Sequence, residues 1–237
     1  DDRAFLERNY VSVNAHELAH QWFGDYVTAR SDAHHWLQES FATHYNWLYE
    51  KEVFGQSHFD WGRRTAQNNS LDESKKNDLP VAHSEGGTVR HYPKGAFVLN
   101  MLKYVLGGRE VYNKCIKHYL ETHPYANVDS EDLLIACEDI TGMQLDWFWE
   151  EWIYKGGEPH YKVSFRDVTE NAGEKNSARY SEFIVQQVQE QSEVTGLSEA
   201  GGNKTNSVND DPFVQEADNG SPTPAGLWKM PVWFQVH

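Results

Sequence analysis

The stretch His16-Glu17-Leu18-Ala19-His20, together with Glu39 further along the chain, decides how this sequence is interpreted. In an α-helix, residues i and i+4 lie on one face, so His16 and His20 can direct two imidazole nitrogens at a single metal ion. Glu17 is turned by about 100° around the same helix and can stand beside the metal as a general base. A catalytic zinc site takes three protein ligands and leaves a fourth position to water. Glu39 is the natural third ligand.

An ordinary surface helix could also carry two histidines and a glutamate at this spacing. Two features of the neighbouring sequence argue against that interpretation: apolar residues recur along the stretch at helical spacing, and a suitable third ligand follows. We therefore predict one metal centre, formed by His16, His20 and Glu39. One Zn²⁺ ion is the predicted cofactor, although similar ligands also accept cobalt or manganese.

Three blocks of sequence around these residues resemble the aminopeptidase-N-like zinc metallopeptidases of the gluzincin clan. The first block runs from His16 to Gly24, continues at Val27-Thr28, and ends in Trp36-Leu37-Gln38-Glu39. The second is Tyr92-Pro93-Lys94-Gly95-Ala96, and a looser third block runs from Leu145 to Tyr154. The departures near Glu39 are mild: Gln38 and Ser40 stand where the family usually has Asn and Gly.

The resemblance implies a fold and a set of residue roles. The implied fold is α+β: a mainly α-helical, thermolysin-like zinc-peptidase lobe followed by a partial β-sandwich-like segment. By position, the family's metal-ligand roles fall on His16, His20 and Glu39, the base on Glu17, and the transition-state stabiliser on Tyr92. From local sequence alone, Tyr92 would be an ordinary tyrosine at the start of an amphipathic helix.

The implied chemistry is hydrolysis of a peptide substrate. Zinc lowers the pKa of its bound water from 15.7 to about 7, and Glu17 can take the proton as this water attacks the carbonyl. The oxyanion that develops needs a further donor. The phenol of Tyr92 can serve, because a phenol stays protonated at neutral pH.

Three functions remain open at this point. Family members cut from the free N-terminus because an upstream Gly-x-Met-Glu-Asn segment holds the substrate's α-amine, and this sequence has no such segment. We therefore expect a fragment whose active site is completed by an upstream domain of the parent protein, and which is weak or inactive alone. A zinc aminopeptidase is the favoured parent. The alternatives are a thermolysin-like zinc endopeptidase and a non-catalytic scaffold that keeps only the fold.

Composition narrows the range of partners. The formal net charge of −15 at pH 7 argues against nucleic acid and against anionic membrane surfaces, since both attract basic patches. No apolar run approaches the roughly 20 residues that span a bilayer. The two cysteines, Cys115 and Cys137, have no ligand-like spacing, so buried thiols on neighbouring helices are predicted, with a disulfide as the alternative.

Hydrophobic periodicity predicts the order of the secondary structure. Helices are expected over residues 4–23, 36–53, 56–69, 92–106, 110–122, 130–141 and 146–154, with a β-prone link at 25–30 and a polar segment at 70–87. Asp129 and Ser130 offer oxygens to cap a helix. The helices around 4–23 and 36–53 are joined by a short link and should lie antiparallel, which would bring Glu39 to the two histidines.

The chain is expected to form two domains. Residues 1–158 make the helical, zinc-binding catalytic lobe, and residues 159–237 make a partial β domain. Within the second domain, strands are expected at 161–165, 183–188 and 232–236, and a flexible loop at 191–225.

Other polar residues are assigned lesser roles. His34 and His35 form a pair in a loop and are expected to be solvent-exposed or beside the ligands, not bound to the metal. Asp25 or Asp32 could orient a ligand histidine through its other ring nitrogen. Six further histidines are expected at the surface or in packing: His58, His83, His91, His118, His123 and His160.

Overall fold

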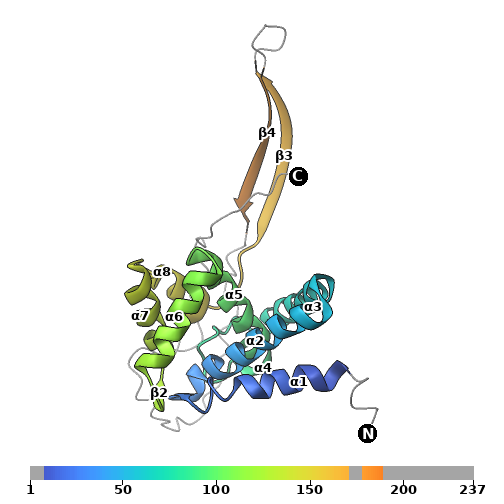
Figure 1. The fold of residues 1–237 in the computed structure, drawn as a ribbon. Helices are drawn as coiled ribbons and strands as arrows, with labels where there is room; N and C mark the ends of the chain where they lie inside the picture. Colours follow the sequence, from blue (N-terminus) through green and yellow to red (C-terminus); the bar gives the residue numbers. More distant parts are fainter. Residues whose placement is uncertain (1–7, 171–177, 189–237) are drawn as a thin grey trace, which may run out of the picture.

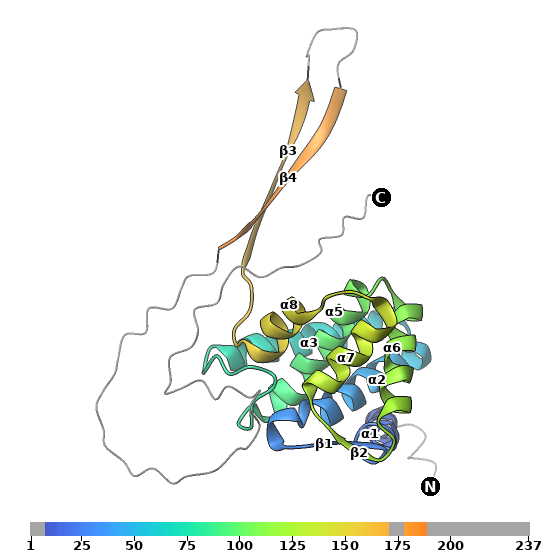
Figure 2. The same ribbon diagram turned by 90° about the vertical axis from the view of Figure 1, so that its left-hand side faces the viewer.

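The structure, a computed structural model, describes residues 8–170 and 178–188. Its helices gather into one lobe, and a long β-hairpin projects away from that lobe (Figures 1 and 2). Within the described ranges, no helix has the length and apolar character that a membrane span requires. The elements, in chain order, are α1 (Arg8–Ala19), β1 (Val27–Ala29), η1 (Asp32–His34), α2 (Trp36–Phe54), α3 (Gln56–Ser74), α4 (Gly87–Val89), η2 (Arg90–Lys94), α5 (Gly95–Val105), α6 (Arg109–Thr122), β2 (Ala126–Val128), α7 (Ser130–Thr141), α8 (Asp146–Trp149), η3 (Glu150–Tyr154), β3 (Tyr161–Glu170) and β4 (Ala178–Gln187).

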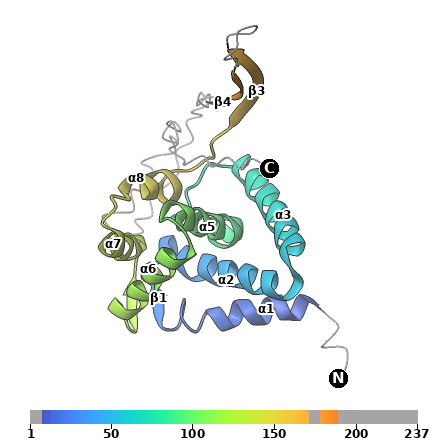
Figure 3. The ribbon, with the colours of Figure 1, turned by 45° about the horizontal axis from the view of Figure 1, so that its top comes forward.

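Helix α2 lies at the centre of the lobe. It contacts α1, α3, α5 and η2, so neighbours cover it on several sides (Figure 3). Trp36 and Phe41 in its first half are almost fully buried and join the hydrophobic core. The same half carries the buried polar residues Glu39, Ser40 and His44. Because buried polar groups are costly without hydrogen bonds, these side chains need partners inside the protein, and Nε2 of His44 lacks one among the described residues.

Helices α1 and α2 run antiparallel, as the short connection between them predicts. Ser12 contacts Asn46 and Glu50, whereas His16, which comes later in α1, contacts Glu39, which comes earlier in α2. This reversed order of contacts is that of antiparallel helices, and it brings the end of α1 to the start of α2.

Helix α1 ends at Ala19, earlier than the predicted end at residue 23. The chain then turns: the N–H groups of Trp22 and Phe23 both donate to the Ala19 carbonyl at 3.1 Å. Gly24 follows with φ +144°, which residues with side chains rarely adopt, and leads the chain into β1. Hydrophobic periodicity predicted a helix as far as residue 23 because Phe23 is apolar. The ring of Phe23 is indeed buried, but it belongs to the turn after the helix.

Helix α3 is longer than predicted, because it continues through Ser74 into the segment expected to be a polar loop. Ion pairs of 2.7 Å join Lys75 to Asp72 and Lys76 to Glu73 at its exposed end. Pairs three residues apart add modest support to a helix, which explains how a polar sequence remains helical here.

A short parallel sheet joins the segment between α1 and α2 to the segment that precedes α7. Residues 27–29 of β1 pair with residues 126–128 of β2. Directly after β2, the Asp129 carboxylate accepts hydrogen bonds from two N–H groups at the start of α7, which confirms Asp129 as a cap. The Ser130 hydroxyl takes a different role from the predicted one, because it accepts the indole N–H of Trp36 at 2.9 Å.

The helix predicted at 92–106 begins earlier and contains a π-helical turn. The segments α4, η2 and α5 follow one another without a break. The N–H of Gly95 bonds to a carbonyl one residue further back than in an α-helix. The carbonyl of His91 is thereby left for another donor, and it accepts the hydroxyl of Ser40 on α2 at 2.5 Å.

Gly95 is needed for this close approach of η2 to α2. A Cβ atom at this position would lie 1.8 Å from the Oγ atom and 2.8 Å from the Cβ atom of Ser40. Only a residue without a side chain fits. Gly95 therefore allows η2, which carries Tyr92, to pack against the first half of α2.

The two cysteines lie in the hydrophobic core between α6 and α7. Cys115 and Cys137 are both buried free thiols, and the Cys115 thiol lies 4.0 Å from the Cys137 carbonyl. The prediction of buried thiols on neighbouring helices is confirmed.

After η3 the chain leaves the helical lobe and forms the hairpin. Strands β3 and β4 pair antiparallel, and both are longer than the predicted strands at 161–165 and 183–188. A mainly helical lobe with small sheets confirms the α+β class. The predicted strand at 232–236 and loop at 191–225 lie outside the described residues. The division at residue 158 and the β-sandwich stay predictions.

Replacing Gly95 by alanine should destabilise the protein by about 1–3 kcal/mol, because the new methyl group overpacks the contact with Ser40. Gly62→Ala on α3 is the matched control, since nothing lies within 4 Å of a Cβ atom there. Alanine favours a helix interior, so the control should be neutral or stabilising by up to about 1 kcal/mol. Adding Ser40→Gly to Gly95→Ala should recover part of the loss. The free energy of unfolding is measured by urea denaturation for the unmodified protein, Gly95→Ala, Gly62→Ala and the double variant. Equal stability of Gly95→Ala and Gly62→Ala would contradict the close contact.

The buried His44 should make the protein acid-sensitive. Burial lowers the pKa of His44 from 6.5 to about 3, and its Nε2 atom has no hydrogen-bond partner among the described residues. Between these two values the unfolded chain binds a proton that the folded chain does not. Stability from this residue is therefore complete above about pH 6.5 and falls as the pH drops, by up to about 1.4 kcal/mol per pH unit.

The variant His44→Gln isolates this contribution, because glutamine does not titrate yet keeps a donor for the Ala96 carbonyl that His44 contacts. Denaturation between pH 8.5 and pH 4.5 should give a shallower loss of stability in the variant below about pH 6.5, while the two slopes agree above pH 7. Parallel curves over the whole range would show that His44 is protonated in the folded protein.

Candidate metal centre and active site

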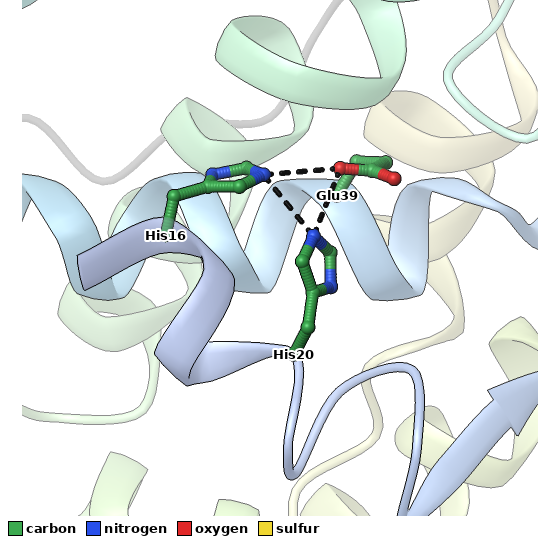
Figure 4. A group of neighbouring side chains, drawn as sticks. All are labelled: His16, His20 and Glu39. Atoms are coloured by element: carbon green, nitrogen blue, oxygen red, sulfur yellow. Dashed lines mark hydrogen bonds and ion pairs between the residues drawn. The ribbon is translucent and has the colours of Figure 1, made fainter. Parts of the chain in front are cut away.

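Three side chains from two helices meet at one point beside α2 (Figure 4). His16 lies in the last turn of α1, His20 directly follows that helix, and Glu39 lies in the first turn of α2. The Oε2 atom of Glu39 is 3.2 Å from His16 Nε2 and 3.4 Å from His20 Nε2, and the two Nε2 atoms are 3.1 Å apart. Among the described residues, this is the one group of three potential ligands whose atoms all lie within 4.8 Å of one another.

The donor atoms of this group suit a zinc ion. His20 Nδ1 lies 2.8 Å from the Phe23 carbonyl, so Nδ1 carries the proton and the lone pair of Nε2 remains available. Two imidazole Nε2 atoms and a carboxylate oxygen at hydrogen-bond distance need a proton or a cation between them. Two nitrogens and one carboxylate oxygen are a ligand set that catalytic zinc sites use.

The electrostatics of the centre favour positive charge. Burial alone would raise the pKa of Glu39, but hydrogen bonds from His16 and His20 outweigh burial and hold this pKa well below its usual range. The hydrogen bond with Glu39 also raises the pKa of His20 to about 9, although burial acts in the opposite direction. The centre therefore stabilises positive charge: without a metal the second proton of His20 supplies it, and a metal ion bound at Nε2 would take the place of that proton.

Tyr92 and Glu17 border the same point. The ring of Tyr92 stacks on His16, with centroids 5.7 Å apart and planes within 4°. Burial, followed by the charge of Glu39 and a hydrogen bond with it, raises the pKa of Tyr92 to about 12. Glu17 is exposed, and its negative charge contributes to the raised pKa of both His20 and Tyr92, so it lies near both side chains. His16, His20 and Glu39 therefore contact one another, Tyr92 contacts His16 and Glu39, and Glu17 lies nearby.

Asp25, Asp32 and His34 take no part in the centre. The two aspartates are exposed, and the Phe23 carbonyl orients His20 in their place, so the predicted role for an aspartate at His20 is wrong. His34 is almost fully buried, and its Nδ1 atom accepts the backbone N–H of Ser130 at 3.2 Å. The expectation that His34 is exposed or beside the ligands is also wrong.

His35 and His91 lie next to the centre. His35 Nε2 is 3.2 Å from Oε1 of Glu39, the oxygen that faces away from the other two histidines. The ring of His91 meets the ring of His35 edge-on, with centroids 5.5 Å apart. The spacing of His35 and Glu39, one helical turn, was the sequence signal for the first contact. No sequence signal exists for the second, because it depends on how η2 packs on α2.

A helical lobe that gathers two histidines and a glutamate from antiparallel helices is typical of metallopeptidases. The Peptidase family M1 domain matches residues 4–152, which is more than half of the chain and contains all five predicted site residues. The chain therefore belongs to peptidase family M1, and the predicted resemblance is confirmed.

Curated relatives agree with this family. Over 170 residues the chain is 32% identical to Aminopeptidase M1 of Arabidopsis thaliana. The alignment covers 68% of the chain and 19% of that protein. It is also 32% identical over 178 residues to the Tricorn protease-interacting factor F2 of Thermoplasma volcanium, covering 69% of the chain and 22% of the relative. The chain thus spans about a fifth of the length of these relatives.

Solved structures share the fold of the lobe. The M1 zinc metallopeptidase from Deinococcus radiodurans is 26% identical, with a TM-score of 0.54 over 63% of this chain and 34% of that one. Yeast LTA4 hydrolase superposes with a TM-score of 0.56 over 65% of this chain and 27% of the other, at 24% identity.

Proposed function

We propose that the protein to which this chain belongs is a zinc aminopeptidase that removes N-terminal residues from peptides. The convergence of His16, His20 and Glu39 beside Tyr92 and Glu17 carries the proposal. Relatives named as aminopeptidases and solved relatives described as zinc metallopeptidases support the choice of reaction and of metal.

In the proposed site, His16, His20 and Glu39 hold the metal. A bound Zn²⁺ supplies a Lewis acid that polarises the scissile carbonyl and acidifies water. The Phe23 carbonyl keeps the His20 tautomer that presents Nε2, and the burial of Glu39 keeps water from competing for its oxygens.

Glu17 is the proposed general base. It directly follows His16 in the helix, so its side chain points in a different direction from those of His16 and His20. It therefore stands beside the metal ligands and is not one of them. Its exposure gives it access to water and to a bound peptide. The carboxylate would accept a proton from the attacking water and pass it to the nitrogen of the leaving amine.

Tyr92 is the proposed hydrogen-bond donor to the developing oxyanion. Its pKa of about 12 means that the phenol keeps its proton at neutral pH and can donate without losing it. The Ser40–His91 hydrogen bond and the close fit at Gly95 hold its π-helical turn, so the phenol is positioned before substrate arrives.

Selection of a free N-terminus is proposed to come from the rest of the protein. The chain spans about a fifth of its curated relatives, and the amine-holding segment that the resemblance implies lies upstream of the zinc helix. A thermolysin-like endopeptidase and a non-catalytic scaffold are the competing outcomes, which the following experiment separates.

Glu17→Gln should leave one zinc per chain in place and reduce turnover by about 10²–10⁴-fold, because only the base is removed. Glu39→Gln is the matched control and should lose most of the zinc. Zinc content and cleavage of an amino-acid anilide are measured on the full-length protein and on this chain alone. Cleavage of N-acetylated peptides would instead indicate the endopeptidase. Absence of zinc from the unmodified protein would exclude the metal centre, and bound zinc without any cleavage would indicate the scaffold.

Tyr92→Phe in the full-length protein should lower kcat by about 10²–10³-fold with little change in zinc content or KM, because the donor acts on the oxyanion and not on the bound substrate. Tyr104→Phe, on the exposed face of α5, removes the same hydroxyl away from the centre and should be silent. A Tyr92→Phe enzyme with unchanged kcat would remove Tyr92 from the mechanism.

A further inference from the structure

The two oxygens of the Glu39 carboxylate have different partners. Oε2 faces the Nε2 atoms of His16 and His20 at 3.2 and 3.4 Å. Oε1 faces the Nε2 atom of His35 at 3.2 Å. One edge of the carboxylate is thus directed at the proposed metal position, and the other is occupied by a third histidine.

We propose that His35 is a positioning residue for Glu39: its Nε2–H donates to Oε1 and thereby keeps Oε2 turned toward the proposed metal. This inference rests on the proposed function, because it concerns a residue behind one of the proposed ligands. It assigns to His35 no contact with metal or substrate.

The backbone places His35 for this contact. It is the residue that precedes α2, with helical φ and ψ of −55° and −24°, and its carbonyl accepts the Glu39 N–H at 3.2 Å. Residues four apart lie one above the other on a helix, so the imidazole leans over the carboxylate. The side chain does not cap the helix, which leaves its donor available for Glu39.

The ring of His35 is supported from the other side. His91 meets it edge-on at 5.5 Å, and His91 Nε2 lies 3.0 Å from the His83 carbonyl, to which it donates. Gly86 makes room for His91, since a Cβ atom there would lie 2.6 Å from His91 Nε2. A series of contacts therefore leads from the loop before α4 through His91 and His35 to the proposed ligand.

The hydrogen bond has a direct consequence for metal binding. A carboxylate with one free oxygen can rotate or present both oxygens, whereas a donor on Oε1 leaves only Oε2 as a strong ligand atom. Removing such an outer partner of a metal ligand typically costs about 10–100-fold in metal affinity or activity. The exposed fraction of the His35 side chain, 41%, also makes this a position where substitution need not disturb the core.

The test compares donor-free and donor-keeping variants in the full-length protein. His35→Phe keeps a ring against His91 but has no donor, His35→Leu is a second donor-free variant, and His35→Gln keeps an N–H near the position of Nε2. We expect zinc affinity, measured by competition with a chelator, to fall by about 10–100-fold in the donor-free variants and to stay close to the unmodified value in His35→Gln. The visible spectrum of the cobalt-substituted protein should change in the same pattern.

His58→Leu is the matched control. His58 on α3 also faces a carboxylate of α2, with its Nε2 atom 3.7 Å from Glu50 Oε2, but this pair lies outside the centre. The control should leave zinc affinity and the cobalt spectrum unchanged.

Two results would overturn the inference while leaving the proposed function intact. In the first, all three His35 variants bind zinc and give cobalt spectra like the unmodified protein. In the second, His35→Gln is weakened as much as His35→Phe and His35→Leu, which would show that the donor is irrelevant. Failure of the unmodified protein to bind zinc would overturn both the proposed function and the inference.

Discussion

The packing of α1 against α2 is the constraint on which the site depends. His16 and His20 stand near the end of α1 and Glu39 near the start of α2, so only an antiparallel pair of helices brings their donor atoms within 4.8 Å. The turn that follows Ala19 supports this arrangement in a second way. It reverses the chain and directs the Phe23 carbonyl at His20, so the same feature sets both the path of the chain and the tautomer of a proposed ligand.

The second contact that shapes the site is that of η2 with α2. A π-helical turn leaves the His91 carbonyl for the Ser40 hydroxyl, and Gly95 allows the two backbones to approach. Tyr92 is thereby held beside Glu39 although the two residues are far apart in sequence. Ser40 stands where the resembling family usually has glycine, and here its hydroxyl contributes a hydrogen bond to the same contact. The position of a proposed catalytic phenol thus depends on a steric fit that involves no metal ligand.

Negative charge is concentrated where a cation would sit. Glu39 is buried among three histidines, and burial of a carboxylate without partners would be costly. Two of those histidines face one oxygen of the carboxylate, and His35 faces the other. The proposed role of His35 follows from this division, and it explains why a partly exposed histidine stands directly before a buried helix.

Much of the site could be predicted from short-range sequence spacing. His16, Glu17 and His20 share one helix, and the periodicity of a single helix is enough to set their relative positions. The α+β class, the family and the order of most helices also followed from local patterns and motifs, because hydrophobic periodicity and caps act within a few residues.

Tertiary structure decided the remaining features. The end of α1 at Ala19, the burial of His34 against Ser130, and the support of His35 by His91 all depend on contacts between segments distant in sequence. The π-helical turn depends on α2 in part, because its freed carbonyl finds a partner there, although Pro93 within the turn also interrupts the α-helical hydrogen bonds. Local sequence cannot specify such features, since the energy that favours them comes from the packing partner, which is known only once the chain is folded.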